Sequence, residues 1–82
     1  MDAFAKEDIS MARIYLSVIA GDNLKKILSK KGMTQEELAF KLGYNDSSPI
    51  RKLISRGIKK IDLIQKIAEV LEVNFMEFFE KS

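Results

Sequence analysis

The sequence is 82 residues long, with 46% hydrophobic and 32% charged residues and a formal net charge of +2. This length supports one small domain with a single core, and the composition fits a folded globular chain rather than a disordered one. Because the sequence contains no Cys and no His, disulfide frameworks, zinc fingers and catalysis by a thiol or an imidazole are excluded.

The charge is distributed unevenly along the chain. Residues 1–23 carry 2 Lys and Arg against 4 Asp and Glu, residues 24–60 carry 10 against 3, and residues 61–82 carry 2 against 5. The net charges of these segments are therefore −2, +7 and −3. A basic segment of this kind is typical of a face that binds nucleic acid or an acidic partner, although charge alone equally allows a solvated lysine-rich surface.

The sequence contains no apolar run long enough to cross a bilayer, and its N-terminus lacks the basic and apolar regions of a signal peptide. We therefore expect a cytoplasmic protein that does not interact with a membrane.

Residues 1–18 are predicted to form an N-terminal extension to a domain that spans residues 19–82. Ile14, Leu16 and Val18 alternate with more polar residues, which slightly favours a β-strand over a helix. A lone strand needs a second copy to pair with, and a helix with apolar residues all round it needs burial against another subunit or against the domain. Both alternatives predict self-association through this segment.

A first core helix is predicted over residues 22–31. Leu24, Ile27 and Leu28 recur at the spacing of one helix face, lysines occupy the other side, and Gly32 is suited to end the helix.

A second helix is predicted to follow Thr34 and to end before Gly43. Thr34 and Glu37 have the spacing of a capping box, in which each side chain accepts a hydrogen bond from a backbone N–H at the helix start. The apolar residues of this helix are Leu38, Ala39 and Leu42.

A third helix is predicted to begin near Ser48 and to end at Gly57. Residues 44–48 have the composition of a turn, and Pro49 is favourable in the first turn of a helix. The side predicted to be buried carries Ile50, Leu53 and Ile54. The opposite side is basic and carries hydroxyl groups, from Ser48, Arg51, Lys52, Ser55 and Arg56.

A fourth helix over residues 61–71 and a short fifth helix after Asn74 complete the predicted elements. The fourth helix has apolar residues spaced for burial, at Ile61, Ile64, Ile67, Ala68 and Leu71. Asn74 and Glu77 have the spacing of a second capping box. The aromatic residues expected to close the core are Phe75, Phe78 and Phe79.

The order of these signals resembles the Xre/Cro-type helix-turn-helix family over about residues 19–80. The most specific part is the run Thr-Gln-Glu-Glu-Leu-Ala at residues 34–39, followed by Leu-Gly at 42–43 and Arg-Gly at 56–57. The resemblance implies an all-α, five-helix, lambda-repressor-like domain. It also implies a DNA-binding transcription regulator, usually a homodimer on a near-palindromic operator and sometimes the antitoxin partner of a toxin.

The resemblance also assigns a DNA-binding set of nine residues. In this assignment Gln35 meets a phosphate, residues 47–55 read bases in the major groove, and residues 56–60 contact the DNA backbone. Short hydroxyls at a helix start suit a close approach to the duplex, and Arg and Lys reach guanine or phosphate. The set is Gln35, Ser47, Ser48, Arg51, Lys52, Ser55, Arg56, Lys59 and Lys60.

One departure from the family pattern concerns the turn before the third helix. The stretch from Gly43 to Gly57 is about two residues longer than usual in the family, and we place the extra residues in the turn at 44–48. Asp46 in this turn can accept a hydrogen bond from cytosine or stabilise the turn as an Asx residue, and the second role is favoured.

The leading hypothesis is therefore a repressor-like regulator that binds double-stranded DNA. The alternative is an antitoxin or another protein-interaction module of the same fold, with weak or no base-specific binding. An enzyme is not expected, because the sequence has no glycine-rich phosphate loop and no metal-ligand cluster. We likewise expect no cofactor and no bound metal.

Overall fold

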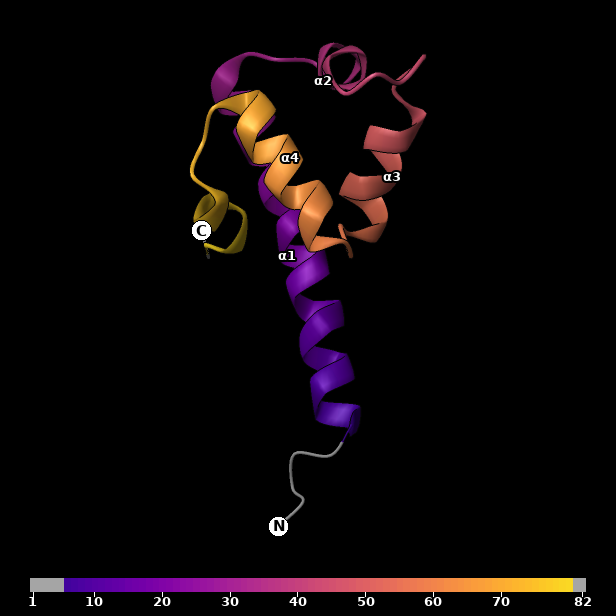
Figure 1. The fold of residues 1–82 in the computed structure, drawn as a ribbon, viewed down its shortest axis with the longest axis vertical. Coiled ribbons are helices and arrows are strands. Elements are labelled where there is room, and N and C mark those ends of the chain that lie inside the picture. The colour runs from indigo at the N-terminus through magenta and orange to yellow at the C-terminus, as the bar shows by residue number, and fades with distance from the viewer. Residues whose placement is uncertain (1–5, 81–82) are drawn as a thin grey trace.

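A computed structural model describes the backbone of residues 6–80 and the side chains of residues 14–80. These residues form only helices, joined by short loops and with no strand among them (Figure 1). The elements are α1 (Lys6–Lys31), α2 (Gln35–Lys41), α3 (Ser48–Arg56), α4 (Ile61–Leu71) and the 3₁₀-helix η1 (Phe75–Phe79). The all-α class predicted from the sequence is confirmed, with a 3₁₀-helix in the place of the fifth helix.

Helix α1 is continuous through the segment for which the sequence favoured a strand. The strand prediction for Ile14, Leu16 and Val18 is therefore wrong, and the helical alternative holds. The physical reason is that residues 20–28 already form a well-packed helix, and extending an existing helix by one residue costs far less than starting a new element. The N-terminal half of α1 projects beyond the other helices in Figure 1.

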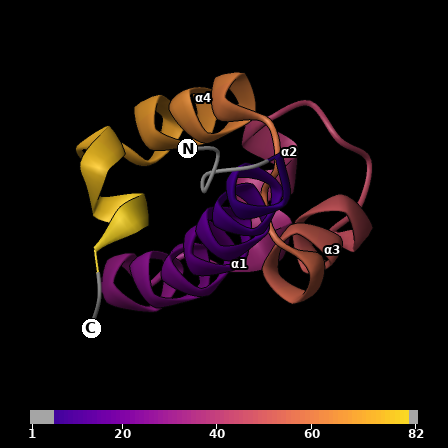
Figure 2. The ribbon, with the colours of Figure 1, turned by 90° about the horizontal axis from the view of Figure 1, so that it is seen from below.

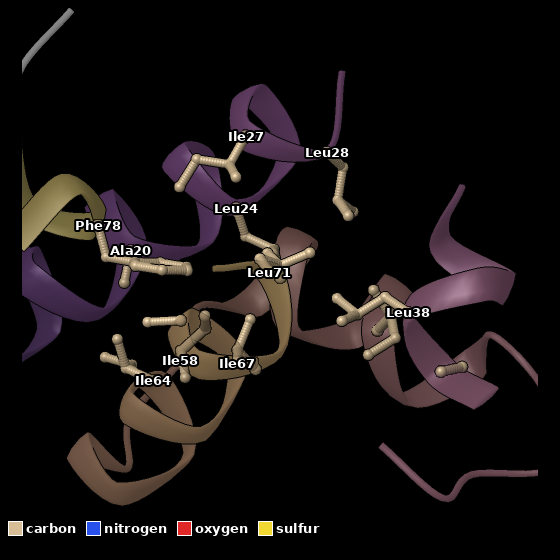
Figure 3. Close-up of a cluster of buried hydrophobic side chains, with 13 residues drawn as sticks. Ala20, Leu24, Ile27, Leu28, Leu38, Ile58, Ile64, Ile67, Leu71 and Phe78 are labelled. Carbon is tan, nitrogen blue, oxygen red and sulfur yellow. The ribbon is translucent and has the colours of Figure 1, made fainter. Parts of the chain in front are cut away.

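The hydrophobic core lies where α2, α3, α4 and η1 surround the C-terminal half of α1 (Figures 1 and 3). Its largest fully buried side chains are Leu24, Leu38, Ile50, Ile58, Ile64, Ile67 and Phe78. The predicted apolar faces are thus largely confirmed, but Ile61 is 56% exposed although its spacing predicted burial. Ile61 is the first residue of α4 and stands at the edge of the core, where helical spacing alone does not ensure cover.

The chain after α4 is held against α1 by a buried asparagine. The side-chain Nδ2 of Asn23 donates hydrogen bonds to the backbone oxygens of Phe78, at 2.8 Å, and of Glu80, at 2.9 Å. The predicted capping box of Asn74 and Glu77 is present at the start of η1. Because η1 has only five residues, a 3₁₀-helix and its tertiary contacts suffice to bring Phe78 into the core.

Helices α1 and α3 approach each other closely at two glycines. A Cβ atom at Gly21 would lie 2.5 Å from the backbone oxygen of Leu53, so only glycine allows this approach. At Gly57, which ends α3 with φ 101° and ψ 163°, a Cβ atom would lie 2.8 Å from the backbone oxygen of Ser17. The same Ser17 oxygen accepts a hydrogen bond of 2.9 Å from the N–H of Ile58.

We predict that Gly57→Ala destabilises the fold by about 2–6 kcal/mol, since backbone strain and steric overlap each contribute about 1–3 kcal/mol. Gly43→Ala is the matched control. Gly43 also has a positive φ, of 91°, but nothing lies within 4 Å of its Cβ position, so only strain of about 1–2 kcal/mol is expected there. Urea unfolding measures both values, and equal losses would contradict the close contact with Ser17.

Candidate nucleic-acid interface

Helix α2 begins with the predicted capping box. The Thr34 N–H donates to Oε1 of Glu37 at 2.8 Å, and the Glu37 N–H donates to Oγ1 of Thr34 at 3.0 Å. The hydrogen bond from the Thr34 backbone is the main cause that lowers the pKa of the Glu37 carboxyl from its ordinary value. The capped helix packs on α3 and α4, with Leu38 and Ala39 buried. Helix α2 thereby supports α3 from one side.

The start of α3 is capped by the turn that precedes it. Asp46 Oδ1 accepts a hydrogen bond of 2.7 Å from the Ser48 N–H, which confirms the predicted Asx role of Asp46. This hydrogen bond is the largest cause of the lowered pKa of the Asp46 carboxyl, and the charges of Arg51 and Lys52 add to it. The turn between α2 and α3 occupies residues 42–47, whereas the sequence placed the turn and its additional residues at 44–48, of which Ser48 is the first residue of α3.

Arg51 is oriented toward the N-terminal end of α3. Its Nη2 donates to the hydroxyl oxygen of Ser47 at 3.2 Å, so the Ser47 side chain contacts Arg51 rather than capping the helix. This contact places a guanidinium group beside the half-buried start of α3, where the helix dipole also favours anions.

One side of α3 is buried and the other is available to a ligand. Ile50 is fully buried, and Leu53 and Ile54 are partly buried against the core. On the opposite side Ser48 is half-buried, and the remaining side chains are exposed, namely Arg51, Lys52, Ser55 and Arg56. The Ser55 hydroxyl donates to the backbone oxygen of Lys52 at 3.4 Å. The structure thus brings five of the nine residues of the DNA-binding set onto one helix face, with Ser47 adjoining it.

The other three residues of the set lie outside α3. Gln35 is the first residue of α2 and is half-buried. Lys59 and Lys60 are exposed in the loop beyond the C-terminal end of α3. Lys60 also provides the backbone oxygen that accepts hydrogen bonds from Leu63 and Ile64 at the start of α4. The basic residues therefore extend from the start of α3 past its end.

Two residues that position α3, Ser17 and Gly21, were not predicted from the sequence. Both lie on α1 and contact the C-terminal end of α3. A signal was present in the sequence, since a glycine inside a helical pattern costs about 1 kcal/mol relative to alanine, so Gly21 called for a structural reason. Ser17 lies in the segment that the sequence assigned to the N-terminal extension, although it is 5% exposed in the structure.

The arrangement of α2, a turn and a basic, exposed α3 is that of a helix-turn-helix motif. A helix-turn-helix family profile matches residues 24–78, which is more than half of the chain. The chain belongs to the helix-turn-helix family. This match confirms the resemblance to the Xre/Cro-type family found in the sequence, and DNA is the characteristic partner of the family.

Comparison with curated proteins and with solved structures gives no significant match. Over the described side chains, residues 14–80, no group of three or more acidic, His or Cys residues is placed to hold a metal ion. Among the described helices, none combines the length and the apolarity needed to cross a membrane.

We predict that the stability of the protein depends on the ionisation of Asp46. Because its pKa is lowered in the folded state from 3.8, its contribution is present above pH 3.8 and is lost as the pH falls through the lower, folded value. In Asp46→Asn the amide oxygen can still accept from Ser48 but does not titrate. Urea unfolding between about pH 5 and pH 2 should show a smaller loss of stability in this variant. The Glu37 carboxyl titrates in both proteins and cancels in the comparison.

Proposed function

We propose that the protein is a cytoplasmic transcription regulator that binds a specific double-stranded DNA sequence, acts as a repressor, and binds a near-palindromic operator as a homodimer. The observation that carries the proposal is the exposed face of α3, which presents Arg51, Lys52 and Arg56 while its other side is packed in the core. In a helix-turn-helix motif the second helix enters the major groove.

The place of each residue in the motif indicates which part of the DNA it would contact. Ser48 and Arg51 lie at the N-terminal end of α3, and a helix start with short hydroxyls and a guanidinium can approach base edges closely. Lys59 and Lys60 are exposed beyond the other end of α3, where they suit contacts with phosphates. Gln35 at the start of α2 has backbone N–H groups beside it that favour a phosphate oxygen.

The proposal assigns no enzymatic reaction to the chain. The sequence has no His and no Cys, and general acid–base or nucleophilic chemistry most often relies on one of these residues. Binding to a polyanion depends instead on basic side chains, and in residues 24–60 these outnumber the acidic ones.

We predict a steep dependence of DNA affinity on salt. About four to five phosphate contacts per subunit give a dimer slope of about −7 to −9 in log K against log salt. Lys59→Ala should make the slope less steep by about 1 per subunit. Lys66→Ala, which removes an exposed lysine from α4, is the control and should leave the slope unchanged. Fluorescence anisotropy with a short duplex measures these slopes, and a slope near zero on every duplex would contradict the proposal.

We predict that selection of duplexes from a random pool enriches a near-palindromic sequence. Arg51→Ala and Lys52→Ala should each relax the preference at particular base pairs, at a cost of about 1–3 kcal/mol per lost bidentate contact. The control variant Lys66→Ala should recover the wild-type sequence.

Failure to enrich any sequence would favour the second candidate function, an antitoxin or another protein-interaction module of this fold. One observation supports that candidate, the exposed apolar side chains of α1, because large exposed apolar residues in a cluster mark surfaces that bind proteins.

A further inference from the structure

Arg51 is linked twice to Ser47, the residue just before α3. The backbone N–H of Arg51 donates to the backbone oxygen of Ser47 at 2.9 Å, and its side-chain Nη2 donates to Oγ of Ser47 at 3.2 Å. Ser47 is half-buried and Arg51 is exposed. In Figure 2, α3 and the loop that leads into it lie at the outer edge of the molecule. The Ser47 hydroxyl therefore directs an exposed guanidinium along the outer surface of the motif.

The contact with Ser47 leaves the guanidinium able to bind a two-pronged acceptor. A guanidinium has five N–H groups, which form two parallel pairs of donors. Nη2 contributes one N–H to the pair with Nε and the other to the pair with Nη1. Because Ser47 accepts a hydrogen bond from Nη2, whichever of its two N–H groups is used, one complete pair remains.

A parallel pair of donors selects one base edge in the major groove. Guanine presents two neighbouring acceptors there, O6 and N7. Adenine presents one acceptor beside a donor, thymine presents one acceptor beside a methyl group, and cytosine presents a donor. Guanine is therefore the base that satisfies both N–H groups of the remaining pair of Arg51.

The carboxylate of Asp46 favours a base over a phosphate as the partner of Arg51. Its Oδ1 accepts from the Ser48 N–H at 2.7 Å, which fixes the carboxylate in the turn before α3. Hydrogen bonding with Ser48, and then the charges of Arg51 and Lys52, lower the pKa of Asp46, so these charges interact. A phosphate at Arg51 would be repelled by the same carboxylate, whereas the edge of guanine carries no net charge.

We propose that Ser47 is a positioning residue, which orients Arg51 to read a guanine in each half-site of the operator. The proposal rests on the proposed function and names a base that the operator contains. In this arrangement Ser47 acts through Arg51 and does not itself read a base. A long side chain that is oriented before DNA binds loses less conformational entropy on binding.

Fluorescence anisotropy of the full-length protein on the operator selected from a random pool tests the proposal. The position that Arg51 reads is the one where Arg51→Ala loses its base preference, and the wild type should prefer guanine there by about 10–100-fold. Ser47→Ala should reduce this preference about threefold to tenfold and leave the other positions unchanged. Ser47→Thr keeps the hydroxyl and should stay within about twofold of the wild type.

A double variant separates positioning from a merely structural role. Ser47→Ala should cause no further loss of base preference when Arg51→Ala is already present, because the hydroxyl acts through the guanidinium. A structural role would instead lower the affinity for every duplex by the same factor. Ser29→Ala, which removes an exposed hydroxyl from α1, is the matched control and should leave the preference unchanged. Circular dichroism of every variant checks that helix content is retained.

Asp46→Asn tests the choice of a base over a phosphate. The amide oxygen can still accept from the Ser48 N–H, but the repulsion of phosphates is removed. The affinity for a duplex without the operator should rise about threefold to tenfold more than the affinity for the operator. Glu69→Gln, which removes one exposed acidic group from α4, is the matched control and should change both affinities by the same factor.

Three results would overturn the proposal: a base other than guanine at the position read by Arg51, a Ser47→Ala variant that keeps the wild-type preference or weakens all duplexes equally, or an Asp46→Asn variant that strengthens both duplexes equally. Each of these is measured on an operator that the protein binds, so each overturns the proposal and leaves the proposed function intact. A protein that binds no duplex, or all duplexes alike, overturns the proposed function and this proposal with it.

Discussion

The close approach of α1 and α3 at Gly21 and Gly57 is the constraint on which the candidate interface depends. The two glycines let backbone meet backbone, and the Ser17 oxygen binds the N–H of Ile58 directly after α3 ends. A helix of nine residues has little stability of its own, because helix formation is costly to initiate. Its position is therefore set by what holds its ends.

The two ends of α3 are held by different kinds of interaction. At its start, the Asp46 carboxylate accepts a hydrogen bond from the Ser48 N–H within the turn at residues 42–47. At its end, the constraint is steric and lies in the backbone at Gly57. Between the ends, Ile50 anchors the helix in the core while Arg51 and Lys52 remain exposed. Because α3 is already held in place, a ligand that binds its exposed basic face does not have to order the helix, so less conformational entropy is lost on binding.

One side of α1 is packed in the core, and the other side is exposed. Leu24 and Ala20 are fully buried, and Asn23 fixes η1 by two hydrogen bonds to backbone oxygens. The outer side carries Ile14 and Val18, whose exposure gives no stability to a single subunit. The charge is also divided, in this case along the chain. The net charge of +2 is the sum of a basic segment that contains the motif and of acidic segments toward both ends of the chain.

The sequence by itself determined the helices that carry their own local signals. Thr34 and Glu37 marked the start of α2, Gly57 marked the end of α3, and the Asp46 turn was assigned its Asx role, because caps and turns depend on residues close in sequence. Only the tertiary structure decided the form of residues 14–18, where a short alternation slightly favoured a strand and the chain instead continues α1. It also decided which small residues of α1 meet α3, since contacts between residues 32 to 40 positions apart leave no periodic pattern in the sequence.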